Sequence, residues 1–263
     1  MNPLRLILNI FPEGYIKSII KNILSYSINV MPGPVDLVTV NGISIKMHKD
    51  NVFNNRRLVK EVSGYNTYYS LRKGDIVIDA GAYTGLYTVY AAKKVGSKGK
   101  VIAYEPDPYT MMMLKKNIKL NQLSNVTLVR KGLFDKNDSV PFDIQSVGSN
   151  IVTINTAFHN RKTINKVNVA PLDEEVVRLR LNTVDFIKMD IEGAEIEAMK
   201  GARTTIKKNK NISLAIASYH VVNGRKTYIF LEKFFKKLNM NTKTELNGQL
   251  TTYSSYKKLA RGN

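Results

Sequence analysis

The sequence contains no cysteine, and histidine is scarce, with three in 263 residues. Without cysteine the chain cannot form a disulfide bond, a thiolate zinc site or a cysteine nucleophile. The three histidines are scattered along the chain and do not by themselves make a metal site. A cysteine-free chain fits a reducing compartment, so we expect a cytoplasmic protein, with the inner membrane surface as an alternative place.

Acidic residues are also scarce: 21 Asp and Glu stand against 40 Lys and Arg, which gives a net charge of +19. A charge of this size produces a positive field over much of the surface and attracts anionic partners. Nucleic acid, acidic phospholipid and an acidic or phosphorylated sugar all satisfy that attraction, and charge alone does not rank them. A solubility effect or a generally basic proteome would explain the same charge without such a partner.

Long apolar runs are missing from the start of the chain, although residues 4–31 are rich in Ile and Leu. Lysines and an arginine interrupt this stretch and Pro12 breaks it, so it is too short for the roughly 20 apolar residues of a transmembrane helix. We also find no convincing cleavage site of a secretory signal. Helical apolar spacing over 15–28 predicts a helix that packs on the domain or makes peripheral contact with a membrane surface.

The length and an apolar content of 43% are ample for one large α/β domain with an appendage. Residues 1–70 are expected to form the N-terminal helix and a small β extension, because Val38 to Met47 alternates like a hairpin around Asn41-Gly42. The main domain is expected to span 71–263. Its segment 138–182 is polar and strand-like, which predicts a β-rich insertion near the substrate side of the sheet.

The most informative pattern is an apolar strand, a glycine turn, a helix and a second strand that ends in an acid. Ile76 to Ala80 is short and β-branched, as in a parallel strand buried on both faces. Gly81 and Gly85 bracket a tight turn that lets backbone N–H groups approach a ligand. Glu105 follows about 20 residues later, where a carboxylate can reach the hydroxyls of a ribose.

The turn reads Gly-Ala-Tyr-Thr-Gly and lacks the G-x-G-x-x-G spacing that seats a pyrophosphate. A cofactor without a diphosphate is therefore favoured over a dinucleotide. S-adenosylmethionine has a ribose, an adenine and an amino-acid tail but no phosphate, and it is the cofactor we predict. A purely structural Rossmann-like turn is the alternative.

A second strand-to-helix junction, at 184–195, carries the string Ile-Lys-Met-Asp-Ile-Glu-Gly-Ala-Glu over its last nine residues. Together with 79–88, Tyr104-Glu105-Pro106 and Leu172-Asp173, it resembles the FkbM family of S-adenosylmethionine-dependent methyltransferases. The resemblance covers approximately 74–218. It implies the class I, Rossmann-like α/β fold, a doubly wound sheet that is mostly parallel with an antiparallel final strand.

The resemblance also implies a cofactor site along the strand ends. It suggests that Asp79 orients the glycine loop and the methionine moiety, and that Asp135 meets the adenine amino group. For Asp135, a simple turn aspartate is an equally good interpretation. The predicted cofactor-binding residues are Asp79, Gly81, Ala82, Tyr83, Gly85, Glu105, Pro106, Asp135 and Asp190.

Methyl transfer from a sulfonium is an in-line displacement, so positioning the acceptor supplies much of the catalysis. A hydroxyl acceptor also needs a group that removes or polarises its proton. Asp190, Glu192 and His220 are the candidate catalytic residues, because each follows a predicted strand. Glu192 could instead stabilise a helix N-terminus, and His220 could be structural. These three could converge on a divalent metal ion, but the sequence gives that idea little support, and no metal site is predicted.

Two neighbours of Asp190 complete this part of the sequence. Lys188 points to the same side of the strand as Asp190, where a cation could neutralise a buried acid or hold an anionic acceptor. Glu195 is expected to be a helix-surface or hydrogen-bonding residue.

We therefore expect an O-methyltransferase that acts on a hydroxyl of a sugar, glycan, lipid-linked saccharide or secondary metabolite. An RNA methyltransferase is the main alternative, motivated by the charge. The sequence has no Asn-Pro-Pro-Tyr motif and no recognisable RNA-binding module, which argues against it. A non-catalytic binding protein on the same fold is less favoured, because the acids at positions 79, 105 and 190 are intact.

Overall fold

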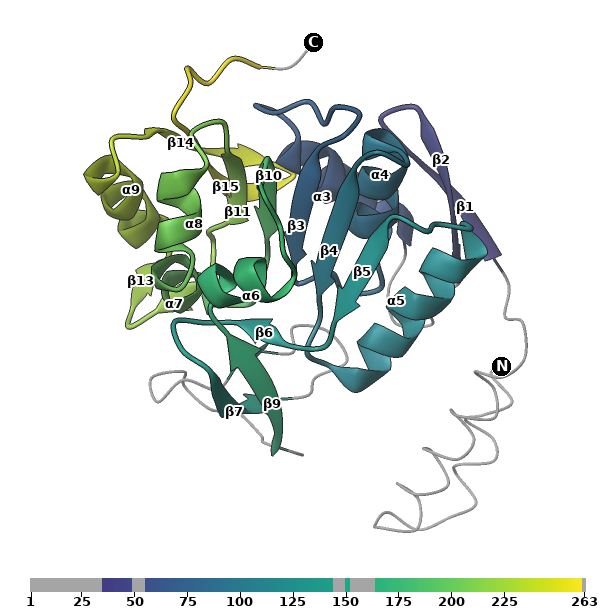
Figure 1. Ribbon diagram of the computed structural model, residues 1–263, viewed down its shortest axis with the longest axis horizontal. Helices are drawn as coiled ribbons and strands as arrows, with labels where there is room; N and C mark the ends of the chain where they lie inside the picture. Colours follow the sequence, from purple (N-terminus) through teal and green to yellow (C-terminus); the bar gives the residue numbers. More distant parts are fainter. Residues whose placement is uncertain (1–34, 49–54, 144–149, 152–163, 262–263) are drawn as a thin grey trace.

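A computed structural model describes residues 35–48, 55–143, 150–151 and 164–261. Its centre is a seven-stranded sheet with helices on both faces (Figure 1). Within the described residues no helix has the length and apolar character needed to cross a membrane. In order across the sheet the strands are β14 (Asn241–Asn247), β15 (Gln249–Ser255), β11 (Ser213–Ala217), β10 (Phe186–Met189), β3 (Ile76–Ala80), β4 (Lys100–Tyr104) and β5 (Val126–Val129).

The strand order reverses between β3 and β10. The chain runs outward from β3 through β4 to β5 and then returns to β10, which pairs with β3 in parallel, Met189 opposite Ala80. Strand β15 runs antiparallel to β11, and β14 runs antiparallel to β15. The prediction of a doubly wound, mostly parallel sheet with an antiparallel final strand is thus confirmed. In such sheets ligands bind at the carboxyl ends of the strands, beside the reversal.

The central strands are apolar on both faces, so each face needs a cover of helices. Along β3, Val77 and Ile78 are both fully buried but belong to two different core clusters. The first cluster lies under the hairpin of residues 35–48 and the second under the helices that follow residue 171. One face carries α3 (Asn55–Tyr65), α4 (Leu86–Val95) and α5 (Pro108–Leu120), and the other carries α6 (Leu172–Arg178), α7 (Glu195–Lys200), α8 (Arg203–Lys208) and α9 (Tyr228–Lys237).

The predicted hairpin is formed by β1 (Val35–Val40) and β2 (Ile43–His48). Asn41 and Gly42 between them both have positive φ, 46° and 76°, as a two-residue type I′ turn requires. The hairpin buries its inward side chains in the first core cluster. The helix expected at 15–28, and with it the predicted membrane contact of residues 4–31, lies outside the described residues.

A second, four-stranded sheet lies beside the main one, in the order β6 (Gly132–Leu133), β9 (Ile164–Ala170), β7 (Asp138–Asp143) and β8 (Asn150–Ile151). Its apolar residues pack on Ile191 and Ala194, directly after β10. The segment 138–182 that we expected to be strand-like therefore contains three of these strands. Its last part forms α6 instead, because Pro171 precedes that helix and three acids occupy its first turn.

The segment after β10 forms two short helices, α7 and α8, instead of one continuous helix. Gly201 separates them, and a β-carbon added there would lie 2.0 Å from the carbonyl oxygen of Phe134. The carboxylate of Asp173 accepts the backbone N–H groups of Thr204 and Thr205, which cap α8. Contact with the small sheet and a cap from α6 thus end one helix and begin the next.

Candidate functional site

The glycine turn between β3 and α4 is fixed against the ends of both neighbouring strands. The backbone N–H groups of Gly81 and Ala82 both donate to the carbonyl of Tyr104, at 3.0 Å. Gly81 has φ +73°, and a β-carbon there would lie 1.8 Å from the backbone oxygen of Asp190. Only glycine fits between β4 and β10 at this point, which explains the first glycine of the motif.

The second half of the turn leads into α4. Tyr83 has φ 51°, an unusual value for a residue with a side chain, and Gly85 has φ +96°. A β-carbon on Gly85 would lie 2.4 Å from a methyl group of Leu114 on α5. The end of β10 and α5 therefore hold the turn in a left-handed conformation, and its backbone is preorganised for a ligand.

Glu105 connects the end of β4 to this turn. One carboxylate oxygen accepts the N–H of Tyr83 at 2.9 Å, and the other accepts the N–H of Asp107 at 3.0 Å. Between them, Pro106 leads the chain to Asp107, which caps α5 through the N–H of Thr110. Burial raises the pKa of Glu105 to about 7, against the lowering effect of the two backbone hydrogen bonds.

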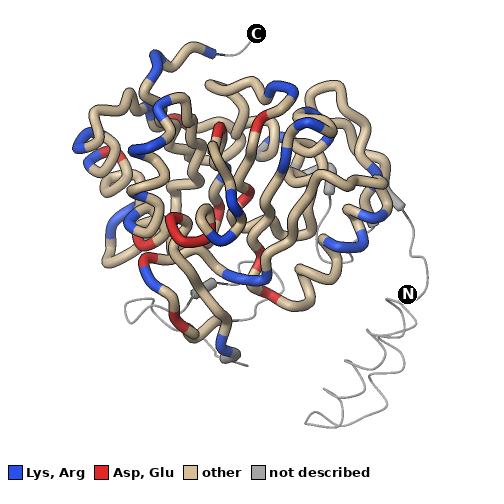
Figure 2. Tube along the Cα trace, viewed as in Figure 1, with Lys and Arg blue, Asp and Glu red and all other residues tan. Residues whose placement is uncertain are grey.

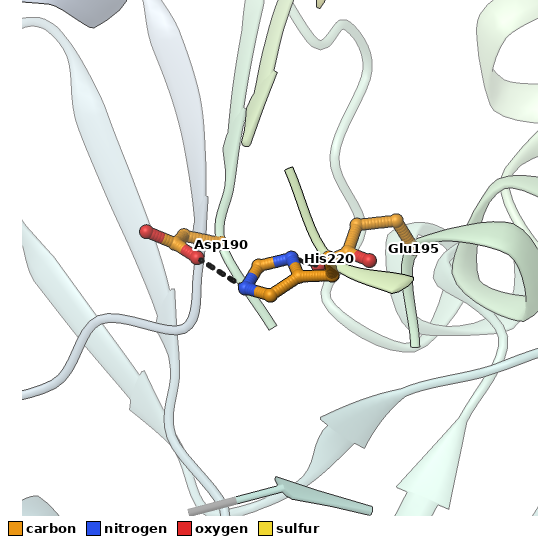
Figure 3. Close-up of side chains that lie close together, drawn as sticks. All are labelled: Asp190, Glu195 and His220. Carbon is orange, nitrogen blue, oxygen red and sulfur yellow. Dashed lines mark ion pairs between the residues drawn. The ribbon is translucent and has the colours of Figure 1, made fainter. Parts of the chain in front are cut away.

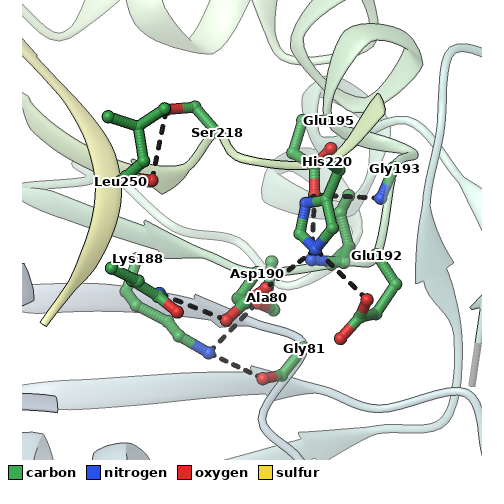
Figure 4. Close-up of polar contacts among 12 residues, drawn as sticks. Ala80, Gly81, Lys188, Asp190, Glu192, Gly193, Glu195, Ser218, His220 and Leu250 are labelled. Atoms are coloured by element: carbon green, nitrogen blue, oxygen red, sulfur yellow. Dashed lines mark hydrogen bonds and ion pairs between the residues drawn. The ribbon is translucent and has the colours of Figure 1, made fainter. Parts of the chain in front are cut away.

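A buried ion pair lies between β3 and β10. Lys188 Nζ is 3.1 Å from Oδ1 of Asp79 and donates to the carbonyl of Gly81 at 2.6 Å. Thr88 on α4 donates to the other oxygen of Asp79 at 2.5 Å. Of the two roles that we predicted for Lys188, its neutralisation of a buried acid is the one that the contacts support. Lys188 therefore links Asp79 to the glycine turn, and Figure 4 shows its contact with the carbonyl of Gly81.

Asp190 follows β10 and faces the turn from the neighbouring strand. Its Oδ2 accepts the hydroxyl of Tyr65 at 2.8 Å, and the side chain of Gln249 lies 3.4 Å from the same oxygen. Gln249 also donates to the hydroxyl of Tyr65. Neither Tyr65 nor Gln249 is among the predicted site residues, and Gln249, the first residue of β15, carries no local sequence signal.

His220 stands among three carboxylates at the carboxyl end of the sheet (Figure 4), and Figure 3 shows two of them, Asp190 and Glu195, on either side of the ring. Its Nδ1 lies 3.0 Å from Oε1 of Glu195, and its Nε2 lies 3.2 Å from Oε2 of Glu192 and 3.7 Å from Oδ1 of Asp190. The three predicted catalytic residues are thus brought together. The fourth member, Glu195, is fully buried and accepts the N–H groups of Ile191 and Gly193, so it is a hydrogen-bonding residue rather than a surface one.

The charge state of His220 follows from these neighbours. Burial by itself lowers its pKa, but contacts with Glu192 and Glu195 and the charges of Glu195 and Asp190 raise it to about 10. The imidazole is therefore cationic near neutral pH in the protein without ligands, and it is not a ready base. Asp190 and Glu192, which are 21% and 35% exposed at their side chains, remain as the accessible carboxylates.

Backbone geometry after β10 serves this cluster. Glu192 and Gly193 both have positive φ, 54° and 102°, so the chain turns back on itself before α7 begins. The turn directs the backbone N–H groups of Ile191 and Gly193 toward Glu195. It also brings the side chain of Glu192 back toward His220 (Figure 4). On the other side, His220 leads into the small hairpin of β12 (Val221–Val222) and β13 (Arg225–Lys226).

The site is acidic although the protein is basic. Lys and Arg are spread along the helices and loops around the molecule (Figure 2), but at the strand ends carboxylates outnumber cations. Among the described residues that contact the glycine turn or His220, the cations are Lys188 and His220 itself. The carboxylates are Asp79, Glu105, Asp190, Glu192 and Glu195.

Asp135 is placed differently from the other predicted residues. It lies in an exposed turn between β6 and β7, so it follows a strand of the small sheet and not the end of β5. Its neighbours Lys136 and Asp138 form an exposed ion pair at 2.8 Å. Its contact with adenine stays a prediction.

A protein-family match covers the part of the chain that contains the predicted site residues. The model of the "Methyltransferase FkbM domain" matches residues 79–248, from the Asp79 of the glycine turn to the hairpin between β14 and β15. The chain belongs to the FkbM methyltransferase family. The resemblance predicted from the two strand-to-helix junctions is thus confirmed.

Two curated relatives of this FkbM protein come from fungi. "Methyltransferase 1" of Beauveria bassiana is 27% identical over 143 residues, which cover 48% of this chain and 57% of the relative. "Methyltransferase sdnD" of Sordaria araneosa is 27% identical over 161 residues, which cover 50% of this chain and 62% of the relative. The match thus spans less than two thirds of the length of either relative.

Among solved structures, fibrillarin of Aeropyrum pernix, determined with natively bound S-adenosyl-L-methionine, superposes with a TM-score of 0.51. The alignment covers 84% of this chain and all of fibrillarin, at 11% sequence identity. At this identity the likeness concerns the fold alone. The fold of the FkbM protein is that of the S-adenosylmethionine-dependent methyltransferases, as predicted.

Proposed function

We propose that this FkbM protein transfers a methyl group from S-adenosylmethionine to a hydroxyl of a small molecule or glycan. The observation that carries the proposal is the position of Asp190. Its backbone oxygen touches the glycine turn, and its carboxylate is held by Tyr65 at 2.8 Å. A cofactor seated on the turn would bring its methyl group to the same strand end as this carboxylate.

The charge of the site supports S-adenosylmethionine as the ligand. The cofactor carries a sulfonium and an ammonium group, and both are favoured where carboxylates exceed cations. Glu105 offers a carboxylate beside the N–H of Tyr83, so a ribose would meet an acceptor at the edge of the turn. A dinucleotide would bring phosphates into this acidic edge and is disfavoured by the same charges.

The carboxylates also support a hydroxyl as the acceptor. An alcohol must lose its proton as it attacks the methyl group, and a partly exposed carboxylate at the site can take that proton. Asp190 is fixed by Tyr65, and Glu192 is 3.2 Å from His220. The cationic imidazole can therefore stabilise the negative charge as it passes from a carboxylate to the acceptor oxygen. A sugar, a lipid-linked saccharide or a secondary metabolite would each supply such a hydroxyl.

The positive net charge is the one feature that favours RNA as the acceptor, but the residues at the site itself are mainly acidic. A phosphate backbone entering at the strand ends would meet Asp190 and Glu192 before any cation of the cluster. We therefore rank an RNA acceptor below a neutral hydroxyl compound. A binding protein without catalysis is also ranked lower, since binding alone requires no fixed carboxylate at the methyl position.

The test is calorimetric titration of the purified protein with S-adenosylmethionine and S-adenosylhomocysteine, followed by methyl transfer from labelled cofactor to panels of glycans, polyols and RNA. We expect saturable cofactor binding that Glu105→Ala abolishes and Glu232→Ala, in an exposed acid of α9, leaves intact. We further expect label in hydroxyl compounds and none in RNA. Absence of cofactor binding by the folded protein, or label in RNA alone, would overturn the proposal.

A further inference from the structure

The Nε2 side of His220 has the layout of a cation site. Glu192 Oε2 and Asp190 Oδ1 approach this nitrogen to 3.2 Å and 3.7 Å from two directions. Adjacent ligands of an octahedral ion at about 2.1 Å lie about 3 Å from each other. Glu192 is already near that separation from Nε2, whereas Asp190 would have to move closer for its oxygen to share the ion.

The opposite nitrogen is held in the way that metal-binding histidines usually are. Nδ1 lies 3.0 Å from Oε1 of the fully buried Glu195, whose position is fixed by two backbone N–H groups. A carboxylate on one ring nitrogen keeps the proton there, so a metal ion that displaces the proton from the other nitrogen finds its lone pair directed toward the ion. The buried acid thus sets the ring orientation, and the two more exposed acids face the free side.

The atoms aimed at this point lack good hydrogen bonds. The His220 side chain is only 9% exposed, and its Nε2 and Oδ1 of Asp190 are both buried without a well-aligned hydrogen bond within the described residues. The other oxygen of Asp190 is occupied by Tyr65. Buried polar atoms that are left in this state usually have a partner that has yet to be seen, such as an ion.

We propose that Asp190, Glu192 and Nε2 of His220 bind one divalent metal ion at the carboxyl end of β10. Two carboxylates and one imidazole suit Mn²⁺, which accepts hard oxygen ligands together with a nitrogen. Three protein ligands leave positions open for water or for the oxygen of an acceptor. A bound hydroxyl would there be polarised and would lose its proton more easily, a role that rests on the proposed function. Binding of the ion does not depend on it.

Mn²⁺ itself is the probe. The full chain is freed of metal with a chelator and titrated with Mn²⁺, and the free ion is followed by its electron paramagnetic resonance signal. We expect one saturable site per chain, and at least about tenfold weaker binding in Glu192→Gln. Glu197→Gln is the matched control, because Glu197 lies in the adjacent helix and pairs only with Lys200 among the contacts described for it. It should bind Mn²⁺ as the wild type does.

His220→Gln should also lose the ion, but this residue is buried and its loss could disturb the fold. Glu192 is 35% exposed, so its variant keeps the test decisive, and an unchanged thermal unfolding transition verifies that it is folded. The proposal fails if the wild type shows no saturable Mn²⁺ binding, as expected when the cluster shares only a proton. It fails equally if Glu192→Gln binds Mn²⁺ like the wild type. Titration with S-adenosylmethionine without metal separates this failure from that of the proposed function.

Discussion

Lys188 and Asp79 occupy directly opposed positions on β10 and β3, and their side chains form a buried ion pair of 3.1 Å. The two side chains are 6% and 0% exposed, so neither charge has access to water. Lys188 also donates to the carbonyl of Gly81. A single cation therefore neutralises the core acid and fixes the turn on which we expect the cofactor to bind.

Replacement of Lys188 by methionine should destabilise the protein by about 3–5 kcal/mol, because the charge of Asp79 would be left buried without its partner. Urea unfolding measures the loss. Lys200→Met removes a half-exposed lysine paired with Glu197 and should cost at most about 1 kcal/mol. The double variant Lys188→Met, Asp79→Asn should recover part of the stability. Equal losses in the two lysine variants would contradict the account of the pair.

Substitution of Gly81 by alanine tests the close approach of β10 to the turn. A β-carbon would lie 1.8 Å from the oxygen of Asp190, so the turn must move, and we expect roughly 100-fold weaker binding of S-adenosylmethionine in calorimetry. Gly42 has a similar φ, +76° against +73°, but has no atom within 4 Å of an added β-carbon. Gly42→Ala should cost about 1–2 kcal/mol of stability and leave binding unchanged. If both variants bind alike, the contact between Gly81 and Asp190 has no functional importance.

The sheet and its glycine turn were predictable because their signals are local. A β-branched strand, two glycines and an acid 20 residues later lie within one stretch of sequence, and the order of such units fixes the topology. The two-part helix at 195–208 was not predictable. The break at Gly201 comes from contact with Phe134, 67 positions earlier, and no periodicity in the helix reports it.

The candidate site was likewise predictable only in part. Asp190, Glu192 and His220 each follow a strand, so their placement at one edge could be predicted, and the structure brings them together. The partners that orient them could not be predicted, because Gln249 comes from the last strand of the chain and Glu195 lies in a helix whose register depends on the turn at Glu192. Long-range contacts decide which acid is buried and which one faces the ligand.

Removal of the Tyr65 hydroxyl should lower kcat without weakening the binding of S-adenosylmethionine. Tyr65→Phe keeps the ring, which packs edge-on against Tyr87, but loses the 2.8 Å hydrogen bond to Asp190. A hydrogen bond to a charged group contributes about 1.5–3 kcal/mol, so kcat should fall roughly 10- to 100-fold. Tyr68→Phe is the control, since that hydroxyl contacts Lys243 on β14. A drop in S-adenosylmethionine affinity rather than in kcat would assign Tyr65 to the cofactor side.

Binding of S-adenosylmethionine should strengthen as pH rises through the pKa of Glu105, which burial raises to about 7. Below that value the free protein carries a neutral carboxyl, which offers a weaker acceptor to ribose hydroxyls and no charge to the sulfonium. The cofactor favours the ionised form, so its affinity should increase by up to about tenfold per pH unit below about pH 7 and level off above about pH 8. Glu105→Gln cannot ionise, and calorimetry across this range should show weak binding without the rise. Protonation of S-adenosylmethionine itself affects binding to both proteins equally. A rise of equal size in Glu105→Gln would therefore show that Glu105 is not the titrating group.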